Sequence, residues 1–263
     1  MIIYKDYKRN HVIIPGREIE LERFINTSYN GINHKLDNSK SSNSEDALTW
    51  SCFDIISQLP TSIKVEALDE IIEHSFSEND MEKKSFSFAN ENEIKIEIGK
   101  IYKGHTKKEE TELDVSIETS KKIIFIEAKL YSSISLKSLK DNKPHDQIAR
   151  KIRVGLDNAL KENKEFYFIF LDIAPRDKLY DFTNEKKSME NAKKLPTKKW
   201  KSVWWFNRYK NGWKGNLEPL KEILSEISTN DSVIKSISEN MGWLTWSDLF
   251  KITMRAMIKN NFA

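Results

Sequence analysis

The sequence predicts an α/β protein in which helices flank a mixed sheet and additional helices follow toward the C-terminus. Apolar residues recur at helical spacing over residues 44–59. Strict alternation of apolar and polar residues follows at 93–98 and again at 112–117, as in half-buried strands. Residues 123–130 and 166–173 are almost wholly apolar, as the central strands of a sheet are.

Length and composition favour a large polar-surfaced domain. The chain has 263 residues, of which 38% are hydrophobic and 32% charged, with a net charge of +3. No run approaches the roughly 18 apolar residues of a membrane span, and the N-terminus lacks a basic segment followed by a long apolar one. The single cysteine, Cys52, excludes an internal disulfide. We therefore expect a cytoplasmic protein without a membrane partner.

Two helices are expected before the sheet. In the first, over residues 44–59, Asn43 or Ser44 can cap the helix and Pro60 ends it. The second helix is expected over residues 63–74.

The three strands that follow are close enough in sequence to form an antiparallel meander. A polar turn at 103–110 separates residues 93–98 from 112–117, and a shorter turn leads to 123–130. The apolar character of 123–130 predicts the central strand.

A helix from residue 144 to about 160 leads to the strand at 166–173. Such a helical crossover is what a parallel neighbour of the central strand requires. Beyond it we expect helices at 217–227, 232–239 and 247–258 and a last strand at 241–246. The chain thus divides into an N-terminal extension (1–43), a core (44–175) and a C-terminal part of the same domain (176–263).

The charges at the end of the central strand are out of place in an apolar run. Glu127 and Lys129 share one face because side chains alternate across a strand. If 112–117 pairs with this strand, Asp114 lies beside Glu127, and two adjacent carboxylates need a positive partner. Mg²⁺, with Mn²⁺ as a substitute, is the hard cation that such oxygens bind. The simpler alternative is an ordinary ion pair between Glu127 and Lys129, with Asp114 in solvent.

Two short motifs, ELDV at 112–115 and IEAK at 126–129, lie within the order helix-strand-strand-strand-helix-strand. In these motifs and in this order of its elements, the chain resembles the PD-(D/E)XK nuclease superfamily. The resemblance covers residues 44–173 and implies the restriction endonuclease-like fold. Leu113 stands where the family often has proline.

The resemblance implies Asp114 and Glu127 as metal ligands and Lys129 as the residue that positions or activates water. It also implies a DNA substrate, hydrolysed in a bacterial or phage restriction, defence or repair system. Two alternatives stay open: a catalytically inactive nucleic-acid-binding or assembly module of the same fold, and an RNA nuclease. The protein can act as a homodimer or as a partner subunit of a defence system.

Two further polar residues are candidates for the site. Glu45 lies on the apolar stripe of the first helix, where a carboxylate needs a partner. The family resemblance implies that it reaches the metal, whereas its first-turn position alone suits a partner of the helix dipole. The resemblance likewise implies that Gln147 faces the site, and a solvated helix residue is the alternative.

Basic residues are concentrated after residue 185. Aromatic and basic side chains are mixed over 199–209, and such a segment can stack bases and bind phosphates, although core aromatics with solvated lysines are the commoner arrangement. Arg150, Lys151 and Arg153 can contact phosphate or lie in solvent, and solvent is the commoner environment for such residues. The candidate DNA-contacting residues are Lys198, Lys199, Lys201, Arg208 and Arg150.

Overall fold

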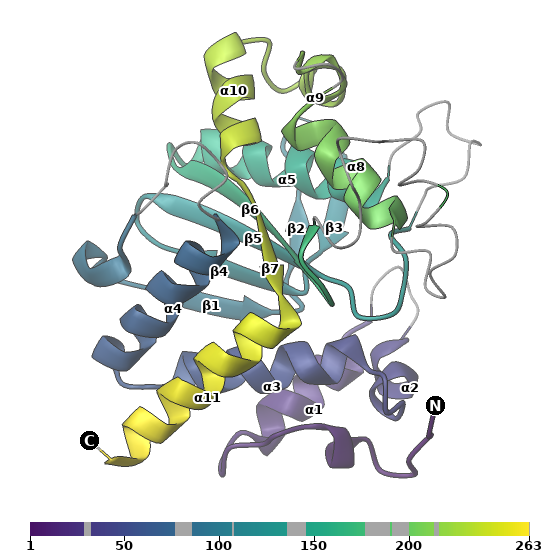
Figure 1. Cartoon of the computed structure of the whole chain (residues 1–263), viewed down its shortest axis with the longest axis vertical. Helices are drawn as coiled ribbons and strands as arrows, with labels where there is room; N and C mark the ends of the chain where they lie inside the picture. The colour runs from purple at the N-terminus through teal and green to yellow at the C-terminus, as the bar shows by residue number, and fades with distance from the viewer. Residues whose placement is uncertain are drawn as a thin grey trace.

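The computed structural model describes residues 1–28, 33–76, 86–106, 108–135, 146–176, 190, 200–212 and 216–262 (Figure 1). The helices are α1 (Glu18–Asn26), α2 (Lys35–Ser39), α3 (Glu45–Gln58), α4 (Thr61–Ser75), α5 (Gln147–Lys161), α8 (Trp200–Lys210), α9 (Glu218–Leu224), α10 (Asp231–Glu239) and α11 (Trp246–Phe262), with 3-10 turns at Tyr7–Asn10 and Phe88–Asn90. The strands are β1 (Lys95–Ile98), β2 (Ile101–Lys103), β3 (Glu110–Glu112), β4 (Val115–Glu118), β5 (Lys122–Ala128), β6 (Glu165–Asp172) and β7 (Met241–Thr245).

Five of the described strands form a mixed sheet in the order β1-β4-β5-β6-β7. β1 and β4 are antiparallel, as are β4 and β5, whereas β6 runs parallel to β5 and β7 parallel to β6. The antiparallel meander and the parallel crossover through α5 are therefore confirmed. Every residue of β5 is buried, as expected for a central strand.

Helices cover both faces of this sheet (Figure 1). Ile124 and Ile126 of β5 share one core with residues of α3, α4 and α11. Ile123 and Phe125 point the opposite way and share a second core with residues of α5, α8, α9 and α10. The strand's two-residue period thus assigns each side chain of β5 to one of two helical layers.

The described part of residues 1–43 forms α1 and α2, which no clear pattern in the sequence predicts. Leu21, Phe24 and Ile25 of α1 pack with Trp50 of α3 in a small third core. Arg17 also pairs with Asp54 of α3, with 2.7 Å between guanidinium nitrogen and carboxylate oxygen. These contacts fix the N-terminal helices to the first helix of the core.

The single strand expected at 112–117 is wrong in one respect, because the chain bends within it. Glu112 ends β3, which pairs with β2 in a separate hairpin around the predicted polar turn. Gly99, at φ +72°, turns the chain out of β1 into this hairpin, and its N–H donates to Asp114 O at 3.1 Å as the chain returns. Asp114 consequently lies in the bend before β4 and does not share a strand with Glu112.

None of the helices in the described part of the chain is long and apolar enough to span a bilayer.

Candidate active site

β5 ends with a glutamate and a lysine on one side of the sheet. Glu127 is fully buried and continues the face that carries Ile123 and Phe125. The Lys129 ammonium lies 2.8 Å from Glu127 Oε1, so the two side chains share a face as the alternation predicted. The Lys129 N–H donates to Leu171 O at 2.8 Å, which extends the pairing with β6 just beyond the end of β5.

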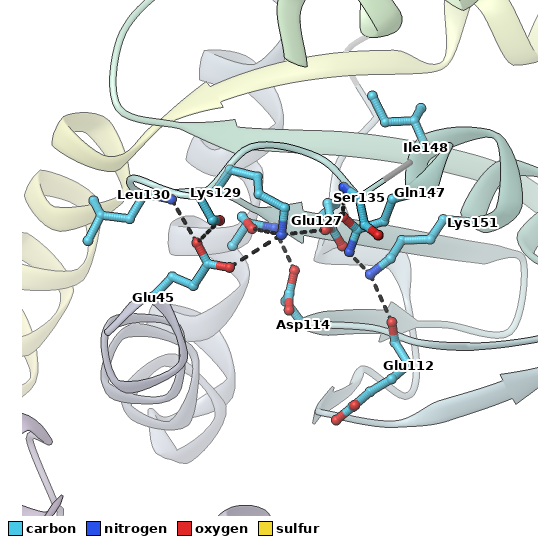
Figure 2. Close-up of polar contacts among 12 residues, drawn as sticks. Glu45, Glu112, Asp114, Glu127, Lys129, Leu130, Ser135, Gln147, Ile148 and Lys151 are labelled. Carbon is cyan, nitrogen blue, oxygen red and sulfur yellow. Dashed lines mark hydrogen bonds and ion pairs between the residues drawn. The ribbon is translucent and has the colours of Figure 1, made fainter. Parts of the chain in front are cut away.

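Asp114 lies beside Glu127 because of the register between β4 and β5. Val115 pairs with Ile126, so the residue before Val115 lies opposite Glu127. Asp114 is half-buried, and its Oδ2 accepts a hydrogen bond from the Ala128 N–H at 2.7 Å (Figure 2). The alternative in which Asp114 lies in solvent is therefore wrong.

A second lysine reaches Glu127 from α5. Lys151 is 1% exposed, and its ammonium pairs with Glu127 Oε2 and donates to Glu112 O at 2.8 Å (Figure 2). The expectation of a solvated Lys151 is wrong, as it is for Arg153, which is buried and pairs with Glu109. Long basic side chains can enter a core when their charged ends meet carboxylates or carbonyls.

These contacts shift the pKa values of the two acids in opposite directions. Burial, followed by repulsion from the Glu127 charge, raises the pKa of Asp114 from 3.8 to about 8. Burial alone would raise the pKa of Glu127, but Lys129 and Lys151 outweigh it and hold that pKa at about 2. In the metal-free protein, Glu127 is thus ionised between two ammonium groups while Asp114 retains a proton at neutral pH.

Glu45 approaches this centre through Lys129. It is the first residue of α3, which begins at the Ser44 cap. One carboxylate oxygen lies 3.3 Å from the Lys129 ammonium. The other accepts hydrogen bonds from the Leu130 N–H at 3.0 Å and the Ser132 hydroxyl at 2.8 Å. Glu45 therefore fixes both Lys129 and the chain that leaves β5.

Gln147 opens α5 and fixes the same outgoing chain from the other side. Its N–H donates to Ser135 O at 3.0 Å, and its side-chain oxygen accepts from the Ser135 N–H at 3.2 Å. The preceding residue, Asp146, caps the helix and accepts a hydrogen bond from the Tyr209 hydroxyl. Gln147 is half-buried rather than solvated. The predicted start of this helix at residue 144 lies outside the described residues.

The structure describes the basic and aromatic segment in part. Lys198 and Lys199 lie outside the described residues, whereas Lys201 and Arg208 are half-buried on α8 and Arg150 is half-buried on α5.

Four aromatic residues of α8, Trp204, Trp205, Phe206 and Tyr209, pack in or against the core, as in the commoner of the two arrangements. Phe206 and Tyr209 are fully buried. Trp204 and Trp205 are half-buried, and the Arg208 guanidinium lies 5.6 Å from each of their ring centroids.

Asp114 and Glu127 could hold a divalent cation. Among the described residues, no group of three or more histidine, cysteine, aspartate or glutamate side chains is arranged to hold a metal ion. Magnesium commonly takes only one or two carboxylates and keeps several waters. The adjacent carboxyl groups of Asp114 and Glu127, whose charges repel each other, fit that requirement.

Lys151 is the site residue that sequence reasoning missed. A signal was present, because Lys151 lies three residues after Ile148 and four before Gly155, both of which are buried on α5. Glu45 became a candidate because it is a charged residue on the apolar stripe of a helix, and Lys151 meets the same criterion on α5.

No protein-family model, curated protein or solved structure matches the chain.

Proposed function

We propose that the protein is a metal-dependent nuclease that hydrolyses phosphodiester bonds of DNA. The observation that carries the proposal is the meeting of Asp114 and Glu127 at the end of β5, with the Lys129 ammonium 2.8 Å from Glu127. A metal ion held by carboxylates can activate water and stabilise charge on a phosphate, and the PD-(D/E)XK resemblance implies a lysine beside such a metal.

The order and direction of the elements support the same proposal. A helix, three antiparallel strands, a helix and a parallel strand follow one another as α3, β1, β4, β5, α5 and β6, with α4 inserted before β1 and the β2–β3 hairpin inserted before β4. This is the arrangement that the PD-(D/E)XK resemblance implies, with the ELDV and IEAK motifs at the adjoining ends of β4 and β5. A setting in restriction, defence or repair follows from that resemblance alone.

In this proposal each side chain has a distinct task. Asp114 and Glu127 would hold Mg²⁺ or Mn²⁺, which supplies a water of lowered pKa and stabilises charge on the phosphate. Lys129 orients that water or neutralises charge developing on the phosphate oxygens. Glu45 holds the Lys129 ammonium at 3.3 Å and so acts as a positioning residue.

A binding module that does not cleave is the second candidate. It is favoured by the two lysines that already neutralise Glu127, since a site neutralised by its own side chains has no need of a cation. Such a module would bind DNA equally well with and without divalent cations.

Cleavage of supercoiled plasmid, linear duplex and single-stranded RNA, with Mg²⁺, Mn²⁺ or a chelator, tests the proposal. We expect metal-dependent cleavage of DNA, lost in Asp114→Asn and in Lys129→Ala. Glu109→Gln is the matched control, because Glu109 also pairs with a base of α5 but lies outside the site. Undiminished cleavage by Asp114→Asn, or none by the wild type with either metal, would refute the nuclease. Cleavage of RNA alone would change the substrate class.

A further inference from the structure

Glu127 occupies an unusual position, with each carboxylate oxygen facing a different ammonium group. Oε1 pairs with Lys129 and Oε2 with Lys151. The side chains of Glu127, Lys151 and Lys129 are 0%, 2% and 7% exposed, so water can contribute little to this cluster. A cation that enters the site must therefore compete with an ammonium group for Glu127.

The two lysines are not held equally. Lys129 has further partners in Glu45, at 3.3 Å, and in the carbonyl of Ala128, at 3.0 Å. Lys151 has, besides Glu127, the carbonyl of Glu112 at 2.8 Å. Lys151 thus has one ionised partner where Lys129 has two, and releasing Lys151 breaks fewer charged contacts.

The charge of the metal-bound site also favours release of Lys151. With a divalent cation bound and every side chain ionised, the positive charges of the cation, Lys129 and Lys151 exceed the negative charges of Asp114, Glu127 and Glu45 by one. That excess favours movement of Lys151 toward a phosphodiester, whose single negative charge restores neutrality. Buried charge must be balanced in this way, because an uncompensated charge in the interior is costly.

We propose that Lys151 is the counter-ion of Glu127 in the metal-free protein, that a divalent cation displaces it, and that Lys151 therefore sets the metal affinity of the site. This inference rests on the proposed nuclease in assuming that a divalent cation binds at Asp114 and Glu127. The displaced ammonium remains beside the site, anchored near Glu112, where it can contact a phosphate oxygen. Metal and DNA should then each strengthen the binding of the other.

Calorimetric titration of Mg²⁺ and Mn²⁺ into the full chain without DNA tests the inference. Lys151→Met removes the competing charge at similar volume, and we expect it to bind metal at least about tenfold more tightly than wild type. Arg153→Met is the matched control, because it also removes a buried, carboxylate-paired base from α5, and its metal affinity should equal that of wild type. Equal or weaker metal binding by Lys151→Met, or no binding by either protein, would overturn the inference.

Lys151→Gln covers the case in which Lys151→Met does not fold. The glutamine amide can still donate to Glu127 and to Glu112 O but carries no charge, so this variant should also bind metal more tightly, whereas Lys151→Arg should resemble wild type.

The nuclease proposal and the counter-ion proposal can fail separately. If Lys151→Met and Lys151→Gln bind metal more tightly but the wild type does not cleave DNA, only the nuclease proposal is refuted. If the wild type cleaves DNA in a metal-dependent way but Lys151→Met and Lys151→Gln bind metal with unchanged affinity, only the counter-ion proposal is refuted.

Discussion

Two buried bases on α5, two residues apart, meet carboxylates in different ways. The Arg153 guanidinium binds both oxygens of Glu109, at 2.8 and 2.5 Å, so one base satisfies one acid. Lys151 shares Glu127 with Lys129, and Asp114 lies beside the same carboxylate. In the Arg153 pair, formed with Glu109, one positive and one negative charge balance each other. The Glu127 cluster, formed with Asp114, Lys129 and Lys151, holds more charged groups than any single ion pair can neutralise.

The difference separates a structural ion pair from a candidate site. Arg153 and Glu109 connect α5 to the residues that precede β3. The Glu127 cluster keeps Asp114 protonated at neutral pH and concentrates opposite charges in the interior. Groups of titratable residues with mutually opposed pKa shifts are typical of functional sites.

The largest expected effect is on the free energy of unfolding, when Glu127 or Glu109 is replaced by uncharged glutamine. Glu127→Gln leaves two buried ammonium groups without a negative partner between them, and we expect the free energy of unfolding to fall by about 3–5 kcal/mol. Glu109→Gln should cost about 1–3 kcal/mol, because the amide oxygen still accepts from Arg153 and Glu109 is 18% exposed. Urea unfolding measures both, and equal losses would remove the distinction between the clusters.

Glu45→Gln should have a smaller effect on stability and a clear effect on catalysis. The amide oxygen can still accept from Leu130 or Ser132, but the ion pair to Lys129 is lost. We expect a loss of about 1 kcal/mol in unfolding free energy and a fall of about tenfold in cleavage rate, typical of a residue that orients an active group. An unchanged rate would leave Glu45 with a role in the helix N-terminus only.

The raised pKa of Asp114 predicts that the stability of the metal-free protein depends on pH. An acid whose pKa rises from 3.8 to about 8 on folding binds more protons in the folded state between those values. Its contribution to stability is therefore present below about pH 4 and is lost as pH approaches 8. Asparagine does not titrate, so the melting temperature of metal-free Asp114→Asn should rise relative to wild type from pH 5 to pH 8. A difference that stays constant across this range would contradict the assigned pKa.

The smallest effect is expected on DNA affinity, from bases outside both clusters. Lys201 and Arg208 are half-buried on α8, and each phosphate contact removed should lower the salt dependence of binding by about one unit of slope. The measurement compares the Lys201→Ala/Arg208→Ala double variant with wild type across a salt series. Lys235→Ala, at an exposed position of α10, is the control. Coincident slopes would leave Arg150 and the residues outside the described ranges as the remaining DNA-contacting candidates.

Periodicity accounts for what the sequence predicted well. The apolar run of β5 and its two-residue alternation placed Glu127 and Lys129 on one face, and helical spacing identified α3. The β2–β3 hairpin was missed because strands of three residues are too short to display a period. The bend at Asp114 was missed because the alternating pattern continues through it.

Long-range contacts set the limit of sequence reasoning at the site. The helical spacing of α5 places Lys151 on the buried face of that helix. Only the fold brings Glu127, Lys129 and Glu112 to its ammonium. Glu45 likewise lies on an apolar stripe in the sequence. Its hydrogen bonds to Leu130 and Ser132 depend on how α3 packs beside the end of β5.

The most direct test of the central claim is anomalous diffraction from crystals grown with Mn²⁺. The account predicts a peak between the carboxylates of Asp114 and Glu127, with the Lys151 ammonium moved away from Glu127 Oε2 and Lys129 still beside Oε1. The Asp114→Asn variant, crystallised in the same way, should lack that peak. An empty position between the two carboxylates at saturating Mn²⁺, with Lys151 still paired to Glu127, would contradict the account.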